Sequence, residues 1–296
     1  MSKPVLVPLL LLMMAVAWPA HAQWGSLGGM MGSGGRQETG ETGREDGTLA
    51  ARPAFDLSAS LTPEQLGPFR ILSIGIDAYT SVPRLANAGN DARAVARQLE
   101  KDYGFETRLL TDPGRQEMMT ALRKFSASAG ASDNLVIYYA GHGIRDHGGG
   151  YWLPRDSHAD SPESWISISD ITALLEQSAA RKILVISDSC YAGTMTRTVK
   201  DDPADISGIL GQKLRQRSRI ALTSGGLEPV SDGRGGHSVF ASALLETLGQ
   251  QGRGPLTGTQ LYLSATGRMD TAGQEPEYAN IPAAGHDGGD FIFLRR

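Results

Sequence analysis

ILVISDSCYAG, residues 183–193, contains Cys190, the only cysteine in a chain of 296 residues. Four aliphatic residues open the stretch, and small polar residues follow them. This pattern predicts a buried strand that ends just before the thiol. A free cysteine without a chemical role is usually buried like a small apolar residue. The position of Cys190 beyond the apolar run therefore favours a reactive role.

Short aliphatic runs alternate with segments of helical periodicity on both sides of this stretch. Strands are predicted over 70–79, 105–112, 134–143, 181–190, 219–225 and 291–296, and helices over 90–104, 114–130, 171–180, 237–250 and 258–269. Such alternation predicts an α/β fold, with a central and mostly parallel β-sheet flanked by helices. Ligands of open sheets of this kind bind beyond the carboxyl ends of the strands.

The chain begins with the layout of a cleavable secretory signal. Lys3 precedes an apolar run from Val5 to Trp18, and Ala20-His21-Ala22 offers a cleavage site after Ala22. The run is short and interrupted by proline, whereas a spanning helix needs about 20 apolar residues. We therefore expect residues 1–22 to be removed, with no stable membrane anchor left behind, and the protein to be periplasmic or secreted.

Residues 23–53 are rich in glycine, serine, threonine and charge, which predicts a flexible linker. Residues 54–296 form a stretch that one α/β domain can occupy. The net charge is −4 with both signs interspersed, which gives no indication of nucleic-acid binding. An unpaired thiol is unusual in an exported protein, so it is either shielded or kept because it reacts.

A glycine-flanked histidine ends the strand predicted before that of Cys190. His142 and Cys190 therefore follow two strands that could be neighbours in the sheet. An imidazole beside a thiol favours the thiolate and can later protonate a leaving amine. The Gly143 N–H could join that of Cys190 in stabilising a developing oxyanion. The alternative is a turn histidine and an inert small core residue.

VIYYAGHG, followed by ISDSCYAG with the cysteine 48 positions after the histidine, resembles the caspase-like cysteine peptidases of clan CD, peptidase C14. The similarity continues through YWLPRDS, LTSGGLEPVSDGRGGHSVFASALLETL and HDGGDFIF, and so covers residues 70–296. SDSCYAG stands where true caspases have QACxG, which places the resemblance with metacaspases and bacterial caspase homologues. The resemblance implies a cysteine endopeptidase with a caspase-like sandwich fold.

The same resemblance implies specificity for Arg or Lys before the cut. Asp188, two positions before the cysteine, and Asp91, in an Asn-Asp pair opening the first helix, match carboxylates that line a basic-residue pocket in metacaspases. Two partly desolvated carboxylates attract a guanidinium or ammonium group and repel an acidic one. A helix N-terminal charge and a turn residue are the alternatives for Asp91 and Asp188. Tyr191, Ala192 and Ala140 depart from the family pattern and leave subsite detail open.

Other chemistries find less support. Zinc binding by His142, His147, His158 and Cys190 has no recognised ligand spacing, and neither a G-x-S-x-G elbow nor a Walker loop occurs. No cofactor is expected, although calcium binding by Asp201, Asp202 and Asp205 stays open. The alternative from another class is a catalytically silent caspase-fold module that binds a partner, which would usually have lost the histidine or the cysteine.

The segment 191–218 is too long for an ordinary connection in an α/β domain, which predicts that it contains a functional loop. Its basic residues are Arg197, Lys200, Lys213, Arg215 and Arg217. A loop attached to the nucleophile's own strand would present them at high effective concentration, and many caspase-like enzymes are processed in the equivalent loop. We therefore expect self-cleavage after one of them, with an intact loop as the alternative.

Overall fold

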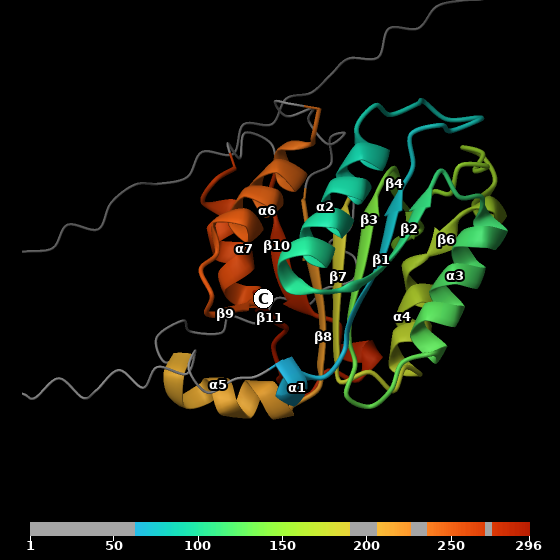
Figure 1. The fold of residues 1–296 in the computed structure, drawn as a ribbon. Helices are drawn as coiled ribbons and strands as arrows, with labels where there is room; N and C mark the ends of the chain where they lie inside the picture. Colours follow the sequence, from blue (N-terminus) through green and yellow to red (C-terminus); the bar gives the residue numbers. More distant parts are fainter. Residues whose placement is uncertain (1–62, 190–205, 226–235, 270–273) are drawn as a thin grey trace, which may run out of the picture. The chain divides into compact units, whose positions relative to one another are not determined.

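A mixed, mostly parallel sheet lies at the centre of the computed structural model, which describes residues 63–189, 206–225, 236–269 and 274–296 (Figure 1). Within these ranges the sheet has six strands in the order β10-β8-β7-β3-β1-β2. Its strands are β1 (Phe69–Gly75), β2 (Glu106–Thr111), β3 (Asn134–Ala140), β7 (Lys182–Asp188), β8 (Ser218–Thr223) and β10 (Glu277–Asn280). Neighbouring strands run parallel except β10, which is antiparallel to β8.

Helices and smaller strands surround this sheet. The helices are α1 (Pro63–Leu66), α2 (Ala88–Tyr103), α3 (Arg115–Ala127), α4 (Ile168–Glu176), α5 (Ile206–Arg215), α6 (Val239–Gln250) and α7 (Gly258–Thr266), with 3-10 turns at Pro162–Ser164 and Pro282–Ala284. Three short strands, β4 (Gly143–Asp146), β5 (Gly149–Trp152) and β6 (Ile166–Ser167), form one antiparallel sheet, and β9 (Pro255–Thr257) pairs with β11 (Ile292–Leu294).

The central strands are buried on both faces. Every residue of β3, β7 and β8 is buried, as expected of strands covered by helices on both sides. Successive side chains point to opposite faces, so Val136 and Leu184 pack toward one hydrophobic cluster while Ile137 and Val185 pack toward the other. Two cores result, one on each face of the sheet.

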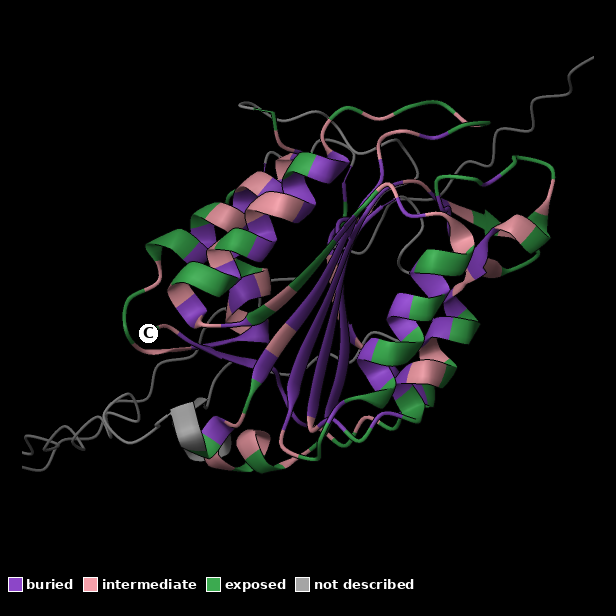
Figure 2. Cartoon of the chain, turned by 45° about the vertical axis from the view of Figure 1, so that its right-hand side comes forward, coloured by how far each residue is buried: buried purple, intermediate pink, exposed green. Residues whose placement is uncertain are grey.

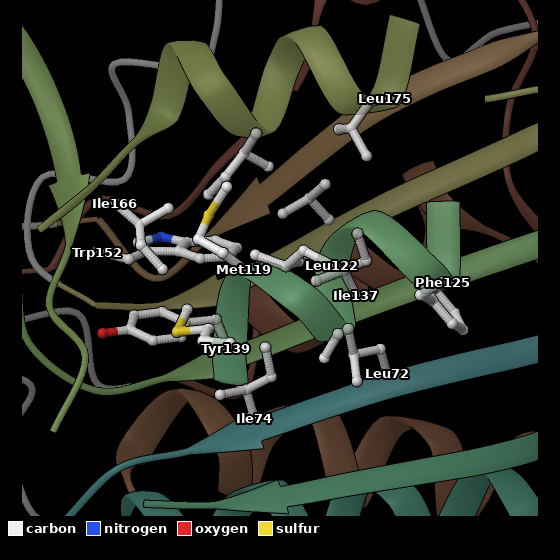
Figure 3. Close-up of a cluster of buried hydrophobic side chains, with 14 of the residues drawn as sticks. Leu72, Ile74, Met119, Leu122, Phe125, Ile137, Tyr139, Trp152, Ile166 and Leu175 are labelled. Atoms are coloured by element: carbon white, nitrogen blue, oxygen red, sulfur yellow. The ribbon is translucent and has the colours of Figure 1, made fainter. Parts of the chain in front are cut away.

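The two faces are covered by different helices. Helices α2, α6 and α7 lie over one face, and α3 and α4 lie over the other (Figures 1 and 2). Each helix turns a buried stripe inward and an exposed one outward, the amphipathic pattern of surface helices (Figure 2). Figure 3 shows the core under α3 and α4, which contains Tyr139 and Trp152. The rings of these two residues are stacked, with their centroids 4.3 Å apart.

The predicted α/β fold class, a mostly parallel sheet between helices, is confirmed. Strand 70–79 was predicted too long. β1 ends at Gly75, because the backbone N–H groups of Asp77 and Ala78 donate to the Asp112 carboxylate instead of continuing the ladder. The first long helix starts at Ala88, two residues earlier than predicted, since the Asp77 carboxylate accepts hydrogen bonds from its first N–H groups.

The sequence pattern did not reveal two features of the fold. The second half of segment 191–218 contains helix α5. The predicted closing strand is present as β11 and pairs with β9, outside the central sheet. The predicted signal and linker, residues 1–53, lie outside the described residues. In the part of the chain that is described, no helix has both the length and the apolarity to cross a bilayer.

Candidate active site

His142 follows a strand that neighbours the strand of Cys190, as predicted. β3 and β7 are parallel and adjacent, with Ala140 paired to Asp188 in the register. The residues after these two strands therefore leave the sheet side by side at its carboxyl edge. Cys190 itself lies just outside the described residues, so its pairing with His142 stays a prediction.

The backbone of His142 is fixed by two tyrosines from neighbouring segments. Its N–H donates to the Tyr79 hydroxyl at 2.7 Å, and its carbonyl accepts from the Tyr139 hydroxyl at 2.6 Å and from the Leu153 N–H at 3.0 Å. The Tyr79 ring lies 4.7 Å from the imidazole, centroid to centroid. Burial raises the pKa of Tyr79 well above its usual range, so its hydroxyl stays neutral.

The imidazole of His142 is oriented by a backbone carbonyl. Its Nε2 lies 2.8 Å from the carbonyl oxygen of Pro83. A carbonyl can only accept, so Nε2 carries a proton and the neutral ring keeps its lone pair on Nδ1. Nδ1 is therefore the atom that can take a proton. The side chain is half-buried, which leaves it access to a reacting group.

Gly141 is required where the two tyrosine hydroxyls converge. A Cβ at this position would lie 2.6 Å from the Tyr79 oxygen and 2.7 Å from the Tyr139 oxygen. Gly141→Ala must displace the groups that hold His142, because atoms in a packed interior have little room to move. We expect it to destabilise the fold by about 1–3 kcal/mol and to lower activity further than the stability loss explains.

Gly252→Ala is the matched control, since a Cβ there would meet nothing within 4 Å. Thermal unfolding and peptide hydrolysis of both variants check the expectation. If Gly141→Ala matched Gly252→Ala in stability and in rate, the tyrosine contacts would not be what holds His142.

The acidic residues predicted to line a pocket come together at the same edge of the sheet. Asp91 lies in the first turn of α2 and Asp188 ends β7; they are 1% and 3% exposed. Burial raises the pKa of Asp188 to about 7, with the nearby charge of Asp91 adding to the rise. Burial also raises the pKa of Asp91, against hydrogen bonds from His237 and Ser238 that lower it.

Several buried polar atoms around Asp188 lack hydrogen-bond partners in the described part of the chain. They are Asp188 Oδ1 and the hydroxyls of Tyr138 and Ser224. Tyr138 and Ser224 interact with the Asp188 carboxyl, yet neither completes hydrogen-bond geometry with it. Buried polar groups are normally satisfied. Two hydroxyls thus lie beside the buried Asp188 carboxyl, and their hydrogens can rotate toward it.

Gly143 is buried and begins β4 directly after His142. Its N–H was predicted to stabilise an oxyanion together with that of Cys190, and this role stays a prediction. His147, in the turn between β4 and β5, has a side chain that is 91% exposed, and His158 is also exposed. Among the residues that the structure describes, no group of three or more His, Cys, Asp or Glu could hold a metal ion. The acidic residues considered for calcium, Asp201, Asp202 and Asp205, lie outside them.

Sequence reasoning missed the residues that support the predicted ones. Pro83 contributes a backbone carbonyl, which no side-chain pattern reveals. His237 and Ser238, at the start of α6, contact the acidic pair from 146 and 50 residues away in sequence. The only signal for Ser238 was its suitability as a helix cap, a role it also has.

A mostly parallel sheet between two helical layers, with a histidine and an acidic pair at its carboxyl edge, defines a caspase-like domain. The chain belongs to the peptidase C14 family, whose model, described as the caspase domain, matches residues 70–284. This match confirms the resemblance to caspase-like peptidases of the metacaspase type.

Metacaspase-4 of Arabidopsis thaliana is 25% identical over 150 residues, which are 43% of this chain and 34% of that protein. The chain thus spans about a third of that relative's length. The crystal structure of protein GSU0716 from Geobacter sulfurreducens is similar with a TM-score of 0.55 and 19% identity, over 77% of this chain and all of that one. At 19% identity, the similarity to GSU0716 is evidence only for a shared fold.

Proposed function

We propose that the protein is a cysteine endopeptidase that uses His142 and Cys190 to cleave peptide bonds after Arg or Lys. Family membership supports the chemistry. The observation that carries the specificity is the buried pair Asp91 and Asp188, beside the histidine at one edge of the sheet. The competing function, a silent module that only binds a partner, would need neither an oriented imidazole nor an unpaired thiol.

The chemistry follows from the orientation of the imidazole. Nδ1 of His142 accepts the Cys190 proton, and the thiolate attacks the carbonyl carbon of the substrate. The resulting oxyanion is stabilised by backbone N–H groups, for which we propose those of Gly143 and Cys190. Collapse of the intermediate breaks the C–N bond, and the imidazolium protonates the leaving amine. Water, deprotonated by the same imidazole, then hydrolyses the thioester, so the cycle needs no cofactor.

The acidic pair supports a preference for basic residues. A guanidinium or ammonium ion that enters a low-dielectric site between two carboxylates makes charge-assisted hydrogen bonds, which are about twice as strong as neutral ones. An acidic side chain at the same place would be repelled. Profiling a peptide library with the protein, and with Cys190→Ala as blank, tests this. Cuts after Arg and Lys are expected; cuts after Asp, or none, would contradict the proposal.

We also propose that the protein cleaves itself in the segment after Cys190, and that the cleavage site follows Arg197 or Lys200. Proteases bind their substrates as extended chains, but Lys213 and Arg215 belong to α5, and the Lys213 carbonyl accepts a hydrogen bond from Lys182. The Arg217 carbonyl accepts from two backbone N–H groups. Cleavage after Lys213, Arg215 or Arg217 would therefore require local unfolding. Arg197 and Lys200 lie outside the described residues.

Mass spectrometry of the protein incubated at high concentration should find termini after Arg197 or Lys200, absent from Cys190→Ala. The fragments should co-elute, because β7 and β8 stay paired in the sheet. An intact chain with full activity would exclude self-cleavage as an activation step. For the N-terminus we propose export, with residues 1–22 removed so that the mature chain begins at Gln23.

A further inference from the structure

Two adjacent residues at the start of α6 donate three hydrogen bonds to the acidic pair. His237 Nδ1 lies 2.6 Å from Asp91 Oδ1, the Ser238 N–H lies 3.1 Å from Asp91 Oδ2, and the Ser238 hydroxyl lies 2.5 Å from Asp188 Oδ2. We call these three donors of His237 and Ser238 the donor clamp. It joins the start of α2 to the end of β7 through a third element.

The direction of each hydrogen bond in the clamp is determined by its surroundings. The Ser238 oxygen accepts the backbone N–H of Ala241 at 2.9 Å as the cap of α6, so its own proton is free to point at Asp188. A carboxylate only accepts, so His237 carries its proton on Nδ1 when Asp91 is ionised. Asn90 holds the backbone before the clamp by donating to the Gly236 carbonyl at 2.7 Å.

The clamp divides the four carboxylate oxygens into two kinds. Both oxygens of Asp91 and Oδ2 of Asp188 accept a clamp hydrogen bond, whereas Oδ1 of Asp188 is buried with no hydrogen-bond partner among the described residues. Hydrogen bonds from the clamp hold each carboxylate in one orientation and favour its ionised form, against the burial that raises the pKa of both. The same carboxyl also interacts with the hydroxyls of Tyr138 and Ser224.

We infer that His237 and Ser238 are positioning residues for substrate selectivity: they hold Asp91 and Asp188 in fixed orientations as one acidic pair that attracts the basic side chain. This inference rests on the proposed function. The His237 side chain is 25% exposed, against 2% for that of Asp91. It therefore lies nearer the protein surface than the carboxylate to which it donates.

The test compares peptides that are identical except for arginine or citrulline before the cut. Citrulline has the shape of arginine without its charge, so the ratio of kcat/KM for the two peptides measures recognition of charge. We expect His237→Ala to lower this ratio about 10-fold, mainly through a higher KM for the arginine peptide, since a hydrogen bond to a charged group is lost. His237→Asn keeps a donor near the position of Nδ1 and should restore most of the ratio.

Ser238→Ala should lower the ratio at least as much, and Ser238→Thr should retain it. Because Ser238 also caps α6, Ser167→Ala serves as the matched control: it removes an N-cap hydroxyl from α4, where the hydroxyl contacts no residue of the acidic pair. This control should keep the wild-type ratio. If Ser238→Ala does not fold, His237→Ala and His237→Asn still test the positioning role, because they leave the helix cap intact.

The outcomes separate the inference from the function on which it rests. A wild-type protein that cleaves both peptides equally, or neither, overturns the proposed specificity itself. A wild-type protein that prefers arginine, with the same preference in His237→Ala and in Ser238→Ala, overturns the clamp alone. A loss of kcat equal for both peptides would show a merely structural role and would also overturn the clamp.

Discussion

His142→Ala should lower the turnover of a basic peptide substrate by about three or more orders of magnitude, and Cys190→Ala should abolish it. The imidazole and the thiol act as a unit, so losing either removes nearly the whole effect. An alanine at position 142 keeps the backbone hydrogen bonds to Tyr79 and Tyr139. Both variants should therefore unfold at close to the wild-type temperature, and initial rates with a fluorogenic peptide measure the loss.

His147→Ala is the matched control, because this nearby histidine is exposed in the turn between β4 and β5. It should retain the wild-type rate. Activity that persists in purified Cys190→Ala protein would rule out a thiol nucleophile. Equal losses of rate in His142→Ala and His147→Ala would contradict the role of His142 as the acid/base partner.

Asp188→Asn should lower kcat/KM for Arg and Lys substrates by about two orders of magnitude while leaving the Cys190 thiol reactive toward an uncharged reagent. Asparagine keeps the shape of the side chain and can still accept the Ser238 hydrogen bond, but it lacks the charge that attracts a cation. Asp160→Asn, at an exposed position, removes one negative charge elsewhere and should change neither property. Parallel losses in both aspartate variants would point to net charge rather than to the pocket.

The same substitution should stabilise the unliganded protein at alkaline pH. Folded Asp188 keeps its proton up to about pH 7, whereas an unfolded aspartate releases it near about pH 4. The free energy of unfolding therefore falls as pH rises from about 4 to about 7, and it falls no further above about pH 7. Asp188→Asn has no carboxyl at this position and avoids the fall. Its unfolding temperature should therefore exceed that of the wild type by a large margin at about pH 8 and by a small one at about pH 4.5. An equal gain in unfolding temperature at both pH values would contradict a buried Asp188 with a raised pKa.

Much of this arrangement could be predicted from the sequence, because short apolar runs and helical periodicity are local properties. The alternation of strands and helices indicated the sheet, and the strand ends indicated the positions of His142 and Asp188. The end of the helix at Gly104 also followed from the chain, since a glycine can adopt the left-handed conformation found there, with φ of 67°.

The rest depends on contacts between distant segments. Asp91 looks like a helix N-terminal charge in sequence, and only the packing of α2 against α6 shows that it is buried under His237 and Ser238. The carbonyl that orients His142 belongs to the backbone of Pro83, where residue type carries little information. Helix α5 was missed because the length of its segment suggested a loop.

The most direct test of a Cys190 nucleophile with a basic-residue pocket is covalent labelling. The protein is incubated with an arginine-containing peptide chloromethyl ketone or with its citrulline counterpart, and the adduct is located by peptide mapping and timed by intact mass. A Cys190 nucleophile beside an acidic pocket should give a single adduct on Cys190 that forms much faster with the arginine reagent, is slowed by His142→Ala, and loses its preference for arginine in Asp188→Asn. Equal labelling rates for the two reagents, or peptide hydrolysis that continues after Cys190 is fully labelled, would contradict it.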